Sequence, residues 1–301
     1  MTTAFVLSGG AALGAVQVGM LKALQADGVR ADLIVGTSVG AINAAWIAES
    51  AAGYRLDELE TLWLSLRRGH VFSPGLGGVF GLVGRRPSVL DQRALRHLLT
   101  RHVGSARLED AAVPIHVIAT DVLTGRDVRL STGPTVDAIL ASAAMPGVFA
   151  PVIIDGRAYM DGGVVNNTAI SHAVALGATT IYVLPTGWSC ALERLPAGAL
   201  GMVLHGLTVL VQHRLADDVD HYRQIVDIRV VPPPCPIRVG PADFSHAREL
   251  IDQGQASATA WLRHGGDVDV RLLRPHAHTM SDSMPPPIDV PVRRRSGSGR
   301  R

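Results

Sequence analysis

The sequence predicts an α/β protein built on a mostly parallel central sheet. Apolar runs typical of buried strands occur at Thr3–Leu7 and Leu33–Val35. Each run is followed by a segment with apolar residues at helical spacing, Ala15–Leu24 and Ala41–Glu49 respectively. Strands that alternate with helices in this way are typical of a parallel sheet with helices on its faces.

The same class of element returns after residue 110. Pro114–Thr120 and Thr180–Leu184 are further apolar strand candidates, and Thr135–Ala144 has a helical pattern that ends before Pro146. We also predict hairpin strands at Arg126–Leu130, Val152–Ile154 and Ala158–Met160, strands at Gln224–Val231 and Val268–Leu273, and a helix at Ser245–Arg263.

Two segments depart from this pattern. Residues 53–110 form an insertion with helical patterns at Leu56–Leu66 and Asp91–Arg101 and a glycine-rich apolar stretch, Gly69–Gly84. A plain connection is the alternative, but an insertion that carries apolar residues between sheet elements is a candidate cap over a pocket. Residues 275–301 are rich in Pro and Arg and are expected to be a disordered tail, so that residues 1–274 form the domain.

Composition restricts the class of partner. The 301-residue chain is 47% hydrophobic and 18% charged with a net charge of +2, which gives ample material for a core and no reason to expect nucleic acid. Cys190 and Cys235 have neither a disulfide framework nor metal-ligand spacing, so no metal and no cofactor is expected. A reduced, cytoplasmic location follows, and no oligomeric state is indicated.

One later stretch is notable for what it lacks. Leu195–Gln212 contains no Asp, Glu, Lys or Arg, but its glycines and Pro196 argue against a membrane-spanning helix. We expect a helix buried in the domain here. Contact with a membrane surface is the alternative, which would make the protein peripheral.

The strongest chemical signal is Gly36-Thr37-Ser38-Val39-Gly40. It follows a predicted strand and precedes a predicted helix, which is the context of a nucleophile elbow rather than of an ordinary turn. Gly36 and Gly40 suit such a turn because neighbouring backbone approaches closely. Ser38 at a helix N-terminus would lie where developing negative charge is favoured.

A serine nucleophile also needs donors for an oxyanion and a base. The loop Ser8–Ala15 follows the first strand, and parallel strands end at the same edge of a sheet, so the N–H groups of Gly10 and Ala11 are candidate donors. A nucleotide-binding loop is the competing interpretation. It fails on the sequence because Ala11 replaces a required glycine and no Gly-Lys-Ser/Thr follows.

The residues alone leave two candidates for the base. None of the twelve histidines lies in a suggestive motif, and His172 is the least improbable candidate for a Ser-His-Asp triad. Asp161, in Asp161-Gly162-Gly163, is the better candidate, although Asp-Gly-Gly by itself usually marks a turn.

Together these motifs resemble the patatin-like phospholipase family. The resemblance rests on Gly9–Gly14, Gly36–Gly40 and Asp161–Gly163 in the family's order, and on Ala141–Phe149 before the aspartate. It implies a three-layer α/β/α fold and a Ser38–Asp161 dyad without histidine. It also implies an oxyanion site at Gly9, Gly10 and Ala11, and supporting glycines at Gly14, Gly36, Gly40, Gly162 and Gly163.

The function implied is hydrolysis of a lipid ester, from a phospholipid, a lysophospholipid or a related lipid. Two positions depart from the family's loop, which usually has a third glycine and a basic residue where this chain has Ala11 and Leu13. Alanine keeps its N–H, so the oxyanion site is retained if its φ is negative. Two rivals remain: a Ser-His-Asp esterase using His172, and a catalytically weak lipid-binding or interaction protein on the same fold.

Overall fold

The computed structural model describes residues 1–50, 54–71, 73–74, 90–188, 195, 198–266 and 273–274. An eight-stranded sheet with the order β10-β9-β1-β2-β5-β8-β7 runs through these residues, and β6 pairs with β5 outside that path. The strands are β1 (Thr3–Leu7), β2 (Leu33–Thr37), β5 (Ile115–Asp121), β6 (Asp127–Leu130), β7 (Val152–Ile154), β8 (Arg157–Asp161), β9 (Thr180–Leu184) and β10 (Asp227–Val230). Pairing is parallel from β10 to β5 and antiparallel among β5, β6, β7 and β8.

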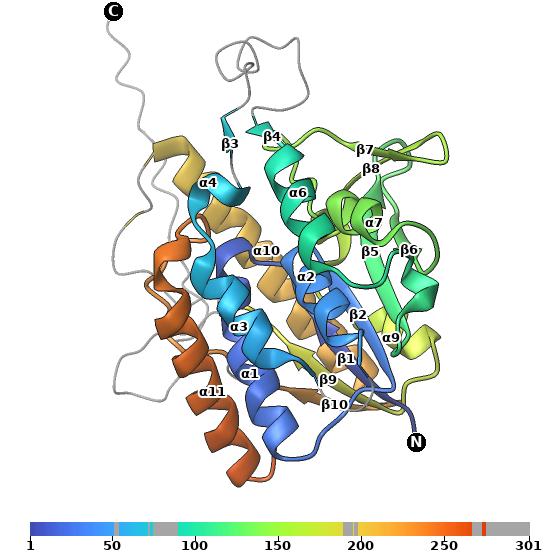
Figure 1. Ribbon diagram of the computed structural model, residues 1–301. Helices are drawn as coiled ribbons and strands as arrows, with labels where there is room; N and C mark the ends of the chain where they lie inside the picture. Colours follow the sequence, from blue (N-terminus) through green and yellow to red (C-terminus); the bar gives the residue numbers. More distant parts are fainter. Residues whose placement is uncertain are drawn as a thin grey trace, which may run out of the picture.

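Helices cover both faces of this sheet, as expected for a three-layer α/β/α protein (Figure 1). One layer contains α1 (Ala15–Ala26), α2 (Val39–Ile47), α3 (Leu56–Ser65) and α11 (Ala247–Arg263), and the other contains α9 (Ile170–Ala175) and α10 (Gly198–Tyr222). Side chains alternate along β1, so that Phe5 and Leu7 belong to the first core and Ala4 and Val6 to the second. The α/β class predicted from the sequence is confirmed.

The strand register brings the site loops to one edge of the sheet. Leu7, the last residue of β1, pairs with Gly36 of β2 and with Leu184 of β9. The segments that follow these three strands therefore leave the sheet next to one another, as parallel pairing requires.

Strand β5 lies between β2 and β8 and brings the ends of these two strands to the same level of the sheet. Its Ile118 pairs with Thr37, the last residue of β2, and its next residue, Ala119, pairs with Asp161, the last residue of β8. Since these pairings are adjacent along β5, Ser38, the residue after Thr37, is at the level of Asp161 on the other side of β5.

The insertion contributes α3, α4 (Arg68–Val71), α6 (Arg93–His102) and a small sheet of β3 (Ser73–Pro74) and β4 (Leu90–Asp91). The predicted helix at Asp91–Arg101 starts later, because Asp91 pairs with Ser73 and its carboxylate accepts the Arg93 N–H at 2.8 Å. Most of the glycine-rich stretch 69–84, Cys190, nearly all of the predicted strand 268–273 and the tail 275–301 lie outside the described residues.

The expectation for Leu195–Gln212 was wrong in part. This stretch supplies the first half of α10, and it is not buried: Val203 is 59% and Leu210 67% exposed. Burial begins at Gln212 and continues at Leu215, Ala216 and Val219, where α10 packs on the sheet. No helix in the described part of the chain is long and apolar enough to cross a membrane.

Candidate active site

Ser38 occupies the turn between β2 and α2. Its φ is +53°, in the left-handed region that is costly for a residue with a side chain. The turn is possible because Gly36 and Gly40, two residues away on either side, lack side chains. A Cβ on Gly36 would lie 2.6 Å from Ala41 Cα, and one on Gly40 would lie 2.2 Å from the carbonyl oxygen of Leu7. The elbow expected from the sequence therefore has the required local geometry.

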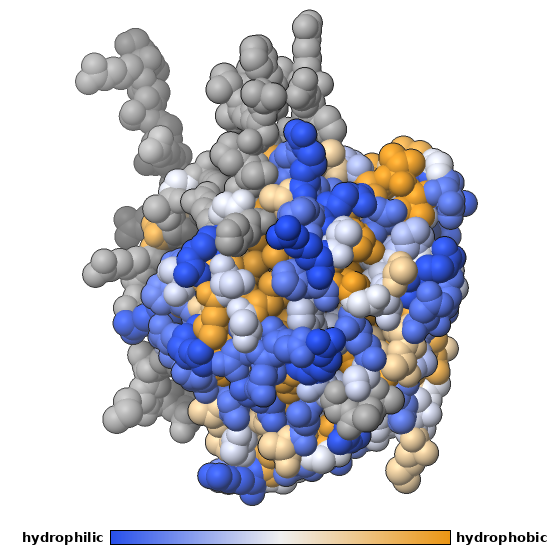
Figure 2. Space-filling model, viewed as in Figure 1, coloured by the Kyte–Doolittle hydropathy of each residue, from blue (hydrophilic) through white to orange (hydrophobic). Residues whose placement is uncertain are grey.

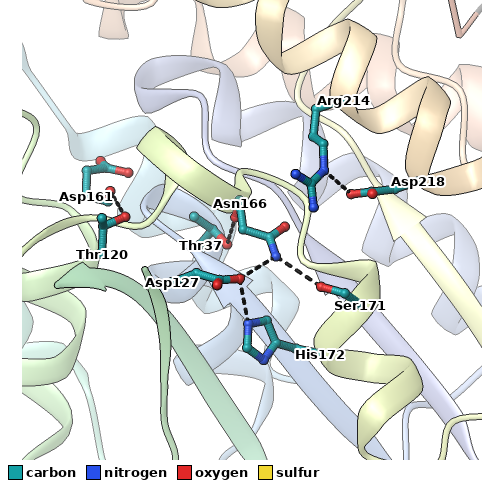
Figure 3. Close-up of polar contacts among 9 residues, drawn as sticks. All are labelled: Thr37, Thr120, Asp127, Asp161, Asn166, Ser171, His172, Arg214 and Asp218. Atoms are coloured by element: carbon teal, nitrogen blue, oxygen red, sulfur yellow. Dashed lines mark hydrogen bonds and ion pairs between the residues drawn. The ribbon is translucent and has the colours of Figure 1, made fainter. Parts of the chain in front are cut away.

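Asp161 is the hydrogen-bond partner of Ser38. Ser38 Oγ donates to Asp161 Oδ2 at 2.8 Å, and the Gly163 N–H donates to Asp161 Oδ1 at 2.7 Å. The backbone of Asp161 is fixed as well, since Ala144 O accepts its N–H at 2.9 Å and its carbonyl accepts from Thr120 Oγ1 at 3.0 Å (Figure 3). The carboxylate thus faces Ser38 without freedom to turn away.

Burial changes the acidity of this carboxylate. Asp161 is 6% exposed, and desolvation raises its pKa from 3.8 to about 6, although the hydrogen bonds from Ser38 and Gly163 oppose the rise. A carboxylate with a pKa near 6 is ionised at neutral pH and is a stronger base than an ordinary aspartate.

Ser142, at the end of α7 (Thr135–Ser142), links the two halves of the site. Its Oγ accepts the Ser38 N–H at 2.7 Å and donates to the carbonyl of Ile118 at 2.5 Å, and its own carbonyl accepts the Gly162 N–H at 3.3 Å. It is fully buried. The Ser38 N–H is therefore occupied, and it is not a donor for an oxyanion.

The glycine loop lies against the elbow. A Cβ on Gly9 would lie 3.1 Å from Ser38 Cβ and 2.5 Å from Asn167 Oδ1, so only glycine fits beside the nucleophile. The Gly9 N–H donates to the carbonyl of Asn167 at 3.3 Å and is not directed at a substrate. Of the three predicted oxyanion donors, Gly9 therefore has its N–H engaged elsewhere.

Thr186 fixes the direction of the next peptide. Its Oγ1 donates to the Gly9 carbonyl at 2.8 Å, and it also contacts Gly10, where a Cβ would lie 2.1 Å from Oγ1. The Gly9 carbonyl and the Gly10 N–H belong to the same trans peptide and point in opposite directions. Because the carbonyl is held by Thr186, the Gly10 N–H is directed away from β9.

The expectation of a negative φ at Ala11 was wrong: Ala11 takes the backbone conformation that a glycine would take there, so its N–H is still a candidate oxyanion donor. The φ of Ala11 is +50°, not negative, at the start of the single 3-10 turn Ala11–Gly14. This conformation costs a residue with a Cβ roughly 1–2 kcal/mol and is the one that glycine adopts freely. The N–H groups of Gly10 and Ala11 take part in none of the hydrogen bonds found among the described residues.

The remaining predicted glycines have packing roles. A Cβ on Gly14 would lie 2.5 Å from Val39 Cγ2, one on Gly162 would lie 2.2 Å from Ile118 O, and one on Gly163 would lie 3.0 Å from Asp161 Oδ1. These distances leave no room for a side chain between the glycine loop, the elbow and the aspartate.

A chain of hydrogen bonds among the buried side chains of Trp63, Asn43 and Gln17 connects the insertion to the loops of the site. Trp63 Nε1 donates to Asn43 Oδ1 at 3.0 Å, and Asn43 Nδ2 donates to Gln17 Oε1 at 2.9 Å. Gln17 Nε2 in turn donates to the carbonyls of Ser8 and Leu184 at 2.9 and 2.8 Å. The chain joins α3 of the insertion to the elbow helix and to the start of the glycine loop. A buried hydrogen-bond network in which the polar groups have partners stabilises a single arrangement of its side chains.

His172 lies in a different cluster. Its Nε2 is 2.9 Å from Asp127 Oδ2, which also accepts from Asn166 Nδ2 at 2.8 Å (Figure 3). No hydrogen bond joins His172 to Ser38 among the described residues. The cluster still reaches the elbow indirectly, because Thr37 Oγ1 donates to the carbonyl of Asn166 at 3.2 Å.

The dyad opens into an apolar cavity of about 60 Å³ that is partly open to solvent. Ser38 and Asp161 are the polar end of this cavity. Figure 2 shows hydrophobic residues reaching the surface in the region of α3 and α6, with polar residues around them. The other lining residues are Ala11, Val39, Ile42, Leu62, Trp63, Leu66, Val71, Leu95, Leu98, Ala143, Met145, Phe149 and Phe244.

Sequence reasoning missed Ser142 and Thr186. Ser142 falls within the segment Ala141–Phe149 that carried part of the resemblance, but nothing in the sequence showed that its hydroxyl reaches Ser38. Thr186 follows a predicted strand without any motif. In the described part of the chain, no group of three or more His, Cys, Asp or Glu residues could hold a metal ion.

A sequence model of the patatin-like phospholipase family matches residues 5–174, more than half of the chain. The chain belongs to the patatin-like phospholipase family. The match contains the glycine loop, the elbow and Asp161, the three features that the geometry joins.

The chain is similar in sequence to proteins from several organisms. It is 34% identical over 166 residues to an uncharacterized NTE family protein of Mycobacterium tuberculosis, which covers 54% of this chain and 43% of that one. It is 27% identical over 200 residues to lysophospholipase nte1 of Aspergillus terreus and 29% identical over 188 residues to human patatin-like phospholipase domain-containing protein 6. These two matches cover 60% and 62% of this chain but only 12% and 13% of the relatives.

The match therefore spans less than half of each of these relatives. Among solved structures, VipD from Legionella pneumophila has a TM-score of 0.45 at 12% identity, with 87% of this chain and 67% of that chain covered.

Proposed function

We propose that this protein is a serine hydrolase that cleaves carboxylic ester bonds of phospholipids, lysophospholipids or related lipids. The observation that carries the proposal is the 2.8 Å hydrogen bond from Ser38 Oγ to Asp161 Oδ2 at the end of an apolar cavity. The names of the relatives, a lysophospholipase among them, agree with a lipid substrate.

The first half of the reaction acylates Ser38. Asp161 accepts the Ser38 proton as Oγ attacks the ester carbonyl carbon, and the resulting tetrahedral oxyanion accepts hydrogen bonds from the Gly10 and Ala11 N–H groups. The C–O bond to the alcohol then breaks, and Asp161 returns its proton to the leaving oxygen. An acyl chain covalently attached to Ser38 remains.

The second half restores the enzyme. Asp161 accepts a proton from water as the water oxygen attacks the acyl carbonyl carbon. When the second oxyanion collapses, the bond between the acyl carbon and Ser38 Oγ breaks, Asp161 returns the proton to Oγ, and the fatty acid is released. The raised pKa of Asp161 suits both steps, because the group must gain and lose a proton near neutral pH.

The lining of the cavity supports an apolar acyl group as the part of the substrate that enters. Leu62, Trp63, Leu66 and Leu95 come from the insertion, whose role as a cap is part of this proposal. No charged side chain other than Asp161 lines this cavity among the described residues. A head group with charge is therefore expected to stay at the mouth, toward solvent.

Active-site labelling tests the proposal. Wild-type protein should react with a fluorophosphonate and release fatty acid from a panel of phospholipids, lysophospholipids and neutral lipids, whereas Ser38→Ala and Asp161→Asn should do neither. His172→Ala is the matched control and should retain turnover. A wild-type protein that is neither labelled nor active would instead favour the lipid-binding rival, and a His172→Ala variant as inactive as Ser38→Ala would favour the triad.

A further inference from the structure

The first half of α10 presents an apolar stripe to the outside of the molecule. Val203, Leu207 and Leu210 are 59, 51 and 67% exposed, and their spacing of four and three residues places them on one face of the helix. Arg214 continues the same face one turn further on. It is the first Asp, Glu, Lys or Arg after Arg194. Exposed leucines and valines gathered in this way mark an interaction surface.

This stripe is next to the catalytic aspartate. Helix α8 (Gly163–Asn166) begins two residues after Asp161, and its Val164 is 51% exposed. Val164, Leu207, Leu210 and Arg214 line the same hollow between α8 and α10, a space of about 700 Å³ that is open to solvent. The apolar surface is thus continuous with the segment that positions the base.

The charges around the stripe show which partner fits. Arg214 is half exposed at the end of the stripe, but its guanidinium is 2.8 Å from Asp218, and Asp217 and Asp220 are close by on the same helix. An excess of positive charge therefore comes from the tail and not from α10. The last described residues, Leu273 and Arg274, are bound to α10, since Gln212 Nε2 donates to the Leu273 carbonyl at 2.7 Å and Arg274 is 3.4 Å from Asp220. The tail that continues from there carries five arginines, Arg293, Arg294, Arg295, Arg300 and Arg301.

We propose that the α8–α10 surface, meaning Val164, Val203, Leu207 and Leu210, is the face by which this protein docks on the surface of an anionic lipid bilayer. The inference rests on the proposed function, because a lipid hydrolase must take its substrate from an aggregate. An exposed apolar stripe along a helix is the pattern of a segment that lies in the lipid interface. The arginines of the tail add attraction to anionic head groups.

Vesicle co-sedimentation tests this proposal with the full chain. Wild type is incubated with phosphatidylcholine vesicles that contain or lack phosphatidylglycerol, and the double variant Leu207→Glu/Leu210→Glu is compared with it. The matched control is Ile225→Glu, since Ile225 is also 65% exposed but lies beyond the other end of α10. A second pair, Leu207→Ser/Leu210→Ser, provides the same comparison if the double glutamate variant does not fold.

Wild type should bind vesicles more tightly when phosphatidylglycerol is present. The double variant should lose about tenfold or more in vesicle partitioning, since two apolar contacts are replaced by charge. The Ile225→Glu protein should bind like wild type. Turnover of a soluble short-chain ester should be the same in all of these proteins, while hydrolysis of vesicle phospholipid should fall with binding.

Three results separate the possibilities. Equal vesicle binding by the double variant and wild type would overturn the proposal. So would a wild-type dimer, seen by ultracentrifugation without lipid, that the double variant converts to monomer, because a second copy would then cover this face. Surface-dependent vesicle binding in a protein that hydrolyses no ester would support the docking surface and reject the proposed catalysis. Ser38→Ala should bind vesicles like wild type in either case.

Discussion

Ser142 Oγ accepts the backbone N–H of Ser38 at 2.7 Å across 104 residues of sequence. The same hydroxyl donates to the carbonyl of Ile118, the β5 residue that pairs with Thr37. Ser142 therefore holds the backbone of Ser38, the proposed nucleophile, in its left-handed conformation, and we expect it to act through Ser38 rather than on a substrate.

Replacing Ser142 with Ala should lower kcat by about tenfold to a hundredfold, because a misplacement of the nucleophile by a fraction of an ångström is costly. It should also destabilise the fold by roughly 2–4 kcal/mol, since two buried backbone groups lose their partner. Ser142→Cys, which retains a weak donor and acceptor, should recover part of kcat. A Ser142→Ala protein that is destabilised but keeps the wild-type kcat would show a structural role only.

The activity should depend on pH through Asp161. Its pKa is raised to about 6 by burial, and the protonated form cannot accept the Ser38 proton. The value of kcat/KM for a non-ionising soluble ester should therefore fall tenfold per pH unit below about pH 6 and reach a plateau above it. A profile that stays flat down to about pH 4, the range of an ordinary aspartate, would contradict this assignment.

Asp161→Asn should be inactive yet more stable than wild type at neutral pH. Burial disfavours the ionised carboxylate in the folded state, so the wild type loses stability as the pH rises from about 4 to about 6. A shift of about two units corresponds to roughly 3 kcal/mol, an upper figure because asparagine replaces the hydrogen bonds imperfectly. Urea unfolding at pH 8 and pH 4 measures the difference, which should be largest at the higher pH.

Asp127→Asn provides a control of opposite sign for that experiment. Burial opposes ionisation of Asp127 too, but the hydrogen bonds from Asn166 and His172 prevail and lower its pKa. Its removal should destabilise the protein at pH 8. If both substitutions lower the free energy of unfolding equally at pH 8, burial of the ionised Asp161 carboxylate does not destabilise the folded protein.

Thr186→Val should lower kcat by about tenfold without a comparable change in KM. The substitution keeps the shape of the side chain but removes the hydroxyl that holds the Gly9 carbonyl, and so the Gly10 N–H loses its fixed direction. Thr186→Ser should retain the wild-type rate. Equal effects on kcat and on KM would instead point to a contact with the substrate.

Ala11→Gly should raise the free energy of unfolding by about 0.5–1 kcal/mol. Relief of the left-handed strain at φ +50° exceeds the entropy that glycine adds to the unfolded chain. Thermal melts measure it, with Ala12→Gly as the control, since Ala12 has no positive φ and should be destabilised. A lower melting temperature for Ala11→Gly would show that the alanine methyl contributes packing that outweighs the strain.

Much of the fold followed from local pattern. The bounds of β1 and β9 agree with the apolar runs from which they were predicted, because strands buried on both faces leave a continuous apolar signal. The contact between Ser38 and Asp161 was expected only from the resemblance to the patatin-like phospholipase family that three short motifs carry. These are the features that short stretches of sequence encode.

The rest depends on contacts between distant segments. Ser142 and Thr186 are ordinary polar residues until the register of β5 and β9 brings them to Ser38 and Gly9. The positive φ of Ala11 was not expected, because alanine gives no local sign of a left-handed turn. The exposure of α10 contradicted its composition, since an uncharged stretch normally indicates burial and here lies outward.

The position of β5 between β2 and β8 has a consequence for how this chain can vary in length. Ile118 and Ala119 fix Thr37 and Asp161 by adjacent pairings, and successive side chains of a strand point to opposite faces. One residue inserted within β8 would bring a neighbour to the place of Asp161 and turn the carboxylate to the other face. The β7–β8 turn at Asp155–Gly156 is upstream of that pairing, so extra residues there leave it unchanged. Natural and engineered insertions should accordingly accumulate at the turn and be absent from the last residues of β8.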